Sequence, residues 1–181
     1  MKALFLMASF FGSLAQLFGG TPSSATYQTV AIYDQLRSQI LSLKPEQIQA
    51  TPNQPIIGML METGYPEAVA TLVAVADGTA SLYFSKGGGI IGAGQHAGPN
   101  KAAKKFIAEA TRHLGKLTPA KTFPLPAKGH TRFYVITPDA VLTADADEND
   151  LGEGQHALSP LFYAGQELIT EMRLSEEQKR K

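Results

Sequence analysis

The sequence predicts an α+β domain in which a five-stranded, mostly antiparallel sheet is combined with three helices. Apolar residues recur at intervals of three and four in three segments, and five shorter runs are rich in β-branched and aromatic residues. Short turns join neighbouring runs, which favours antiparallel pairing and gives the order α-β-β-β-α-β-β-α. In that order the segments are Thr26–Leu43, Ile56–Thr63, Ala68–Ala76, Thr79–Ser85, Pro99–Leu114, Thr131–Thr137, Ala140–Ala146 and Pro160–Leu174.

The three helices are predicted from an apolar stripe and from the residues that flank it. In the first helix the stripe contains Tyr33 and Leu36, and Pro45 ends the helical spacing. The second and third helices begin at Pro99 and Pro160. Proline suits the first helical position because its missing N–H would have no partner there.

The strands are predicted from short apolar runs that turn residues separate. Asp77-Gly78 lies between the second and third strands and indicates a hairpin, because the central residues of that turn need positive φ. Pro138-Asp139 joins the fourth and fifth strands. In Ala68–Ala76 both alternating faces are apolar apart from Thr71, so we expect this strand to be covered on both sides.

Composition and length limit the class of protein. The chain has 181 residues, 16 basic and 16 acidic side chains, and no cysteine. The missing cysteine excludes disulfide-stapled modules and thiol enzymes, and the zero formal charge excludes a strongly basic nucleic-acid binder. The length suits one domain. We divide the chain into an apolar segment with a linker (1–25), a single domain (26–175) and a charged tail (176–181).

The first 25 residues allow two interpretations. Ala3–Phe11 is apolar except for Ser9 and follows Lys2, which fits an export signal but is too short to span a bilayer. The alternative is an amphipathic helix that docks on protein, since its polar face has no basic residue for anionic lipid. A translation start at Met7 would remove most of the signal, and we expect a cytoplasmic protein, with export as the alternative. The candidate partner-binding stripe is Phe10, Phe11, Leu14, Leu17 and Phe18.

A glycine-rich stretch follows the third predicted strand. Gly87-x-Gly89-x-x-Gly92 has the spacing of a dinucleotide-binding loop, but Ile90 and Ile91 lie inside it and the helix begins later. The favoured interpretation is a turn or bulge that bends the strand.

The pattern G-x-G-Q-H-A occurs twice, each time before a helix with proline at its start. Each copy could present free N–H groups beside a histidine, which is the chemistry of an anion site. The favoured alternative is that the glycines shape the turn and the histidine caps or packs locally. With the glycine-rich stretch, the candidate ligand-binding residues are Gly87, Gly88, Gly89, Gly92, Gly94, Gln95, His96, Gly152, Gly154, Gln155 and His156.

No motif indicates a catalytic or metal site, and we expect no cofactor. Asp145–Asp150 is acidic, but a calcium loop that starts at Asp145 would lack its glycine and its last glutamate. Glu62 ends an apolar strand, where it is either a general base or, more ordinarily, a hydrogen-bond acceptor facing a turn.

Charge is unevenly distributed along the chain. Lys101–Arg132 holds eight basic residues and one acidic residue, whereas Asp139–Glu153 holds six acidic residues and no basic one. This pattern favours either a steered partner or self-association, or else two ordinary solvated faces. Nucleic acid is not expected, because the basic segment has no interleaved aromatic residues for stacking.

Two resemblances add to this reading. The element order resembles that of profilin-like and roadblock-like folds, without a roadblock signature motif. The stretch Gly58–Gly94 resembles a family of uncharacterised bacterial proteins, over about Tyr27 to Leu174, and implies no activity. The function we expect is a non-catalytic protein-interaction or scaffold module. The alternatives are a small-ligand or anion-binding domain that uses the glycine-rich loops and, less favoured, an enzyme whose catalytic residues converge only in space.

Overall fold

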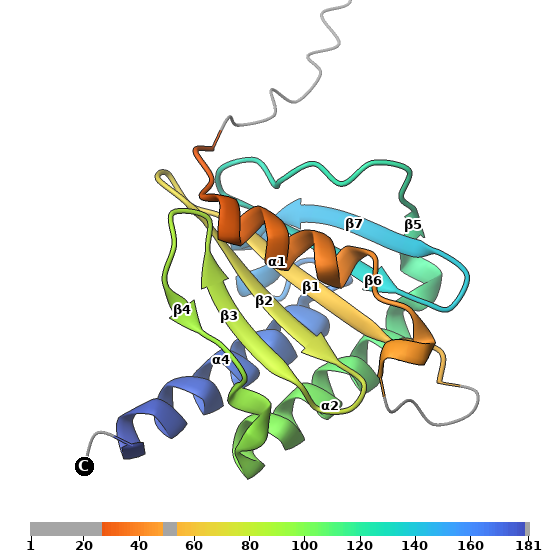
Figure 1. Cartoon of the computed structure of the whole chain (residues 1–181). Coiled ribbons are helices and arrows are strands. Elements are labelled where there is room, and N and C mark those ends of the chain that lie inside the picture. Colours follow the sequence, from red (N-terminus) through yellow and green to blue (C-terminus); the bar gives the residue numbers. More distant parts are fainter. Residues whose placement is uncertain (1–26, 49–53, 180–181) are drawn as a thin grey trace, which may run out of the picture.

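The computed structural model describes residues 27–48 and 54–179 of the chain (Figure 1). The predicted partner-binding stripe, from Phe10 to Phe18, lies outside the described residues, and so does the predicted export signal. The structural statements below concern the described residues.

An antiparallel sheet, whose strands differ in length, forms the centre of the molecule. Its seven strands lie in the order β4-β3-β2-β1-β6-β7-β5, so the first strand in the chain is central. All of its strand pairs are antiparallel. The strands are β1 (Gly58–Gly64), β2 (Val69–Val75), β3 (Ala80–Phe84), β4 (Gly89–Ile90), β5 (Thr118–Pro119), β6 (His130–Ile136) and β7 (Val141–Asp147).

Helices cover both faces of this sheet. The α-helices of the described residues are α1 (Ala31–Leu41), α2 (Ala97–His113), α3 (Glu148–Gly152) and α4 (Ser159–Lys179). Figure 1 shows α1 alone on one face and α2 beside α4 on the other. Three 3₁₀ turns complete the pattern: Pro45–Gln47, Ala93–Gln95 and Leu114–Lys116.

The α+β class predicted from sequence is right, but the prediction of five strands and three helices is wrong. The described residues form seven strands and four α-helices. Strands β4 and β5 are two residues each and contain glycine or proline, so they have too few residues to show an alternating pattern. Helix α3 is five residues long and lies in the acidic segment, where Asp147 caps it by accepting the N–H groups of Asn149 and Asp150.

The two faces of the sheet pack into two separate apolar layers. On one face, Leu72 and Ala74 of β2 pack in a cluster that contains Phe106 of α2. On the other face, Val73 and Val75 pack in a cluster that contains Tyr33 of α1. Strand β2 is therefore covered on both sides, as its two apolar faces predicted.

Candidate functional site

A row of polar side chains crosses the face of the sheet that α1 covers. The register pairs Tyr83 of β3 with Thr71 of β2, and Thr71 with Glu62 of β1. It then pairs Glu62 with Arg132 of β6, and Arg132 with Asp145 of β7. Because directly opposite residues in an antiparallel sheet point to the same face, these five side chains form one transverse row.

Glu62 lies at the centre of this row and is fully buried. The guanidinium group of Arg37 on α1 donates to both oxygens of this carboxylate: Nε lies 2.7 Å from Oε1, and Nη2 lies 2.8 Å from Oε2. The Arg37 side chain is 12% exposed, so water screens the pair only weakly. This two-point bond fixes the position of α1 over the sheet.

A chain of hydroxyl groups continues from Glu62 toward α1. The Thr71 hydroxyl donates to Glu62 Oε1 at 3.1 Å, and the Tyr33 hydroxyl lies 2.9 Å from Thr71 Oγ1. The Tyr33 ring meets the Tyr83 ring edge to face at 5.6 Å. Burial, followed by the nearby Glu62 charge, raises the pKa of both tyrosines above the ordinary value. Both hydroxyls are therefore neutral at physiological pH.

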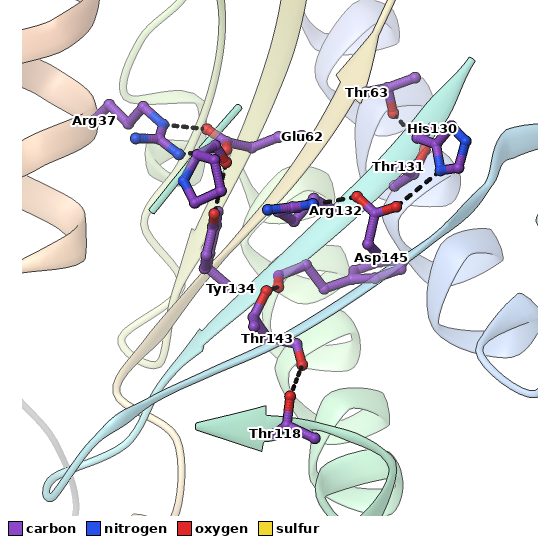
Figure 2. A network of polar contacts seen from close by, with 12 residues as sticks. Arg37, Glu62, Thr63, Thr118, His130, Thr131, Arg132, Tyr134, Thr143 and Asp145 are labelled. Carbon is purple, nitrogen blue, oxygen red and sulfur yellow. Dashed lines mark hydrogen bonds and ion pairs between the residues drawn. The ribbon is translucent and has the colours of Figure 1, made fainter. Parts of the chain in front are cut away.

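The other end of the row is more open to solvent. Asp145 accepts from Arg132 Nε at 2.9 Å, and His130 Nδ1 lies 2.8 Å from its second oxygen (Figure 2). Burial alone would lower the pKa of Arg37, but its hydrogen bonds and charge pairing with Glu62 raise that pKa overall. Each carboxylate of the row is therefore paired with an arginine, Glu62 with Arg37 of α1 and Asp145 with Arg132.

An apolar groove of about 240 Å³ lies beside this network, between α1 and the β3–β4 edge of the sheet. Its floor is the Tyr33–Tyr83 pair, and α1 supplies one wall with Ile32 and Leu36. The opposite wall is formed by Phe84, Gly87, Gly88, Gly89 and Ile91. None of these described lining residues is charged.

The rim of the groove exposes large apolar side chains. Ile32 is 55% exposed, Phe84 is 38% exposed and Ile91 is 62% exposed. Single exposed apolar residues are ordinary on protein surfaces, but three around one uncharged groove form a patch of the kind found at binding sites. The patch lies beside β4, an edge strand of the sheet.

The glycine-rich stretch predicted to bind a ligand forms one wall of this groove. Gly87, Gly88 and Gly89 all have positive φ, and Gly89 pairs with Tyr83 as the start of β4. A Cβ on Gly89 would lie 2.2 Å from the carbonyl oxygen of Leu82, so the close approach of the two strands requires glycine there. The stretch therefore reverses the chain into a short fourth strand, where we predicted a turn or bulge.

The two G-x-G-Q-H-A copies lie at opposite ends of the helical layer. His96 precedes α2 and shares a cleft with the C-terminal part of α4, including Leu174. The second copy begins at Gly152 of α3 and precedes α4, where Lys116 donates to the Ala157 carbonyl oxygen. Helices α2 and α4 run in opposite directions in Figure 1, so the two copies cannot build one site together.

The surroundings of each copy explain much of its sequence. Gly92, Gly94 and Gln95 line a polar hollow with Asp77, Thr79 and Asn100. A Cβ on Gly94 would lie 2.2 Å from the Gly78 carbonyl oxygen, so the backbones pack directly.

At the start of α2, a Cβ on Gly98 would lie 2.4 Å from Glu171 Oε2. The positive end of this helix therefore already faces a carboxylate of the same chain.

The second copy makes a tight local turn. Gly154 has positive φ, and Gln155 donates through its backbone N–H to the Asp150 carbonyl oxygen. His156 Nδ1 accepts from the backbone N–H of Leu158 at 3.1 Å. This histidine thus stabilises the turn into α4, which is the local role that the favoured interpretation gave it.

The charge segregation seen along the sequence is partly cancelled in space. Arg132 of the basic segment pairs with Asp145 of the acidic one, and Lys105 of α2 pairs with Glu167 of α4. One ion pair thus joins the two segments, and the other pairs a lysine of the basic segment with α4.

Comparisons of the chain with models of protein families, with curated proteins and with solved structures find no match. The resemblance to an uncharacterised bacterial family therefore stays a prediction. Within residues 27–48 and 54–179, none of the helices is both long enough and apolar enough to cross a membrane. The same residues contain no cluster of three or more histidine or acidic side chains that could hold a metal ion.

Neither the groove nor the partner of Glu62 has a local sequence pattern that predicts it. The groove combines α1 with residues at least 47 positions later, and the Arg37–Glu62 pair spans 25 positions. One signal was available: Arg37 interrupts a helix whose other inward residues, Tyr33 and Ile40, are apolar. A buried glutamate needs a buried cation.

Proposed function

We propose that this protein is a non-catalytic protein-interaction module that holds an apolar, uncharged segment of a partner protein in the groove between α1 and β3–β4. The observation that carries the proposal is the gathering of Ile32, Phe84 and Ile91 around a groove without charged residues. An uncharged amphipathic segment is the complementary partner, because a charged side chain would lose its hydration there without a counterion.

The network around Glu62 supports this proposal by giving the groove a fixed wall. Arg37 and Ile32 are on the same helix, so the Arg37–Glu62 bond holds Ile32 and Leu36 in place above the sheet. A preformed groove loses less conformational entropy when it binds. The proposal places the protein in the cytoplasm, with export as the alternative.

Site-specific photo-crosslinking in the native host tests the proposal. A photoreactive phenylalanine analogue is placed at position 91 in the groove and, as a matched control, at position 174 on α4, where Leu174 is also exposed. We expect position 91 to form an adduct with an apolar, uncharged segment of another protein, identified by sequencing the crosslinked peptide. Position 174 should not form this adduct.

A charge in the groove gives the second control. Ile32 is exposed and is the second residue of α1, where an aspartate is favoured by the helix dipole, so Ile32→Asp should fold normally. We expect it to reduce the adduct at position 91 by about tenfold, because the new charge at the groove rim opposes an apolar segment. An adduct that forms equally from both positions, or that Ile32→Asp leaves unchanged, would contradict the proposal.

A further inference from the structure

We infer that residues 10–18 of this chain dock into its own groove and compete there with the partner segment. The inference rests on the proposed function and adds how partner binding is regulated. Residues 10–18 of the same chain occupy the groove until a partner segment displaces them. Three observations support it, namely where the described chain begins, how far the preceding residues reach, and the matching chemistry of the two surfaces.

The residue that leads into α1, Val30, lies beside the groove wall. The Val30 N–H donates to the Ser85 carbonyl oxygen at 2.9 Å, which ties the residue before α1 to the end of β3. A Cβ on Gly87, in the groove wall, would lie 3.7 Å from Val30 Cγ2. Tyr27, the first described residue, is three positions before Val30, and its hydroxyl lies near Gly64 at the end of β1. The described chain therefore starts within three residues of the groove wall.

The linker is long enough for the segment to return to the groove. Residues 19–26 separate the stripe from the described chain and include two glycines and two serines. Eight residues reach up to about 27 Å when extended. A helix over the nine residues 10–18 would be about 13 Å long. The extended linker is longer than the helix, so the chain can turn back and place the helix against α1.

The chemistry of the segment matches that of the groove. No charged residue occurs between Lys2 and Asp34, so the whole segment and its linker are neutral. The groove is also uncharged, and its rim exposes the apolar side chains of Ile32, Phe84 and Ile91. In a helix over residues 10–18, three phenylalanines and two leucines would lie on one side. On docking, these side chains would bury the exposed apolar side chains of the rim.

Attachment to the same chain makes even weak docking effective. A short flexible linker gives an effective concentration in the millimolar range, so a segment with a dissociation constant near ~0.1 mM would weaken a partner's apparent affinity on the order of tenfold. A substitution that removes the stripe should therefore tighten partner binding, although the groove itself is unchanged.

Paramagnetic NMR on the full chain tests the inference. The chain has no cysteine, so Ser13→Cys on the polar side of the stripe gives a single attachment point for a nitroxide label. Isoleucine methyl groups report the position of the label: Ile32 and Ile91 lie in the groove, whereas Ile107 packs between α2 and the opposite face of the sheet. The matched control adds Phe10→Ser, Leu14→Ser and Leu17→Ser to the labelled chain.

We expect the label to broaden Ile32 and Ile91 but not Ile107, and the serine control to lose this difference. Equal broadening at all three positions would overturn the inference. A mixed sample distinguishes docking within one chain from docking between two chains. In it, one chain carries the isotope label without a nitroxide, and the other carries the nitroxide without an isotope label. Broadening of the Ile32 and Ile91 signals in this sample would mean that a second copy is the occupant. A mature chain from the native host whose mass lacks residues 10–18 would also overturn it.

The outcomes distinguish the inference from the proposed function. If the nitroxide does not approach the groove but position 91 crosslinks to a foreign apolar segment, the inference fails and the proposed function stands. If the nitroxide does approach the groove but the serine control gives no foreign adduct from position 91, the groove serves its own chain and the proposed function fails.

Discussion

Replacing Arg37 by methionine should strongly destabilise the protein. The change keeps most of the side-chain length but removes both hydrogen bonds to Glu62, at 2.7 and 2.8 Å, and leaves a fully buried carboxylate with only the Thr71 hydroxyl. Breaking one side of a buried ion pair costs about 3–5 kcal/mol. Since domains are stable by about 5–15 kcal/mol, this is a large part of the total.

Urea denaturation followed by far-ultraviolet circular dichroism measures this loss, because the chain has no tryptophan to serve as a fluorescent probe. The expected loss corresponds to a fall in melting temperature of roughly 6–20 °C for a chain of this length. Arg112→Met is the matched control. Arg112 is 72% exposed and pairs with Glu109 one turn earlier on α2, so its loss should cost less than about 1 kcal/mol.

A double variant separates the charge effect from simple loss of packing. In Arg37→Met with Glu62→Leu no charge remains buried, and well-packed apolar replacements of a buried ion pair are often neutral. We expect the double variant to recover to within about 2 kcal/mol of the parent protein. The reasoning would be refuted if Arg37→Met lost less than about 1 kcal/mol, or if the double variant were less stable than the single one.

Three further predictions follow from the described contacts. Gly94→Ala should lower the free energy of unfolding in urea by about 1–3 kcal/mol, because the new Cβ would meet the Gly78 backbone. Gly115→Ala has open space around it and should be neutral or stabilising. Equal effects of the two substitutions would contradict the close approach at Gly94. Tyr83→Phe should preserve or raise the melting temperature, since the buried Tyr83 hydroxyl has no hydrogen-bond partner among the described residues, while Tyr33→Phe should lower it by removing the bond to Thr71; the opposite ranking would contradict the network. The raised pKa values of Tyr33 and Tyr83 mean that the folded state holds these protons more tightly than the unfolded state. Their contribution to folding stability is therefore intact below about pH 10 and is lost as pH rises above it. Absorbance at alkaline pH should show that the two tyrosines ionise together with unfolding, and their ionisation in the still folded protein would contradict their burial.

The longer elements of the fold could be predicted from sequence because each has its own pattern. The apolar runs around Leu60, Leu72 and Leu82 identify β1, β2 and β3, although their ends differ by one or two residues from the structure. The first helix begins at Ala31, not at Thr26. The backbone N–H of Val30 donates to the carbonyl oxygen of Ser85, just after β3, which holds Val30 in extended geometry before the helix.

The short elements could not be predicted in the same way. Strand β4 exists because Gly89 and Ile90 meet Tyr83 and Leu82, and two residues carry no alternation of their own. Helix α4 continues to Lys179, through most of the segment predicted as a charged tail. Charged residues such as Glu177 continue a helix as readily as they form a solvated tail, because glutamate has high helix propensity.

The candidate site was predictable in part. Gly87, Gly88 and Gly89 were identified as candidates, and they do line a groove, but the spacing indicated a nucleotide loop as one interpretation and gave no sign of an apolar wall. The groove depends on how far α1 lies from β3. The Arg37–Glu62 bond sets that position, and no local pattern in the sequence encodes a contact between a helix and a strand 25 residues later.

The most direct test of the groove as a binding surface is a methyl NMR titration. The full-length variant with serine at positions 10, 14 and 17 leaves the groove open, and the probe is a synthetic peptide of residues 8–20 with two added lysines for solubility. We predict saturable shifts of the Ile32 and Ile91 methyl signals, no shift at Ile107, and loss of the Ile91 shift in the Ile32→Asp variant. Shifts of equal size at Ile107, or no saturable shift in the groove, would contradict the account.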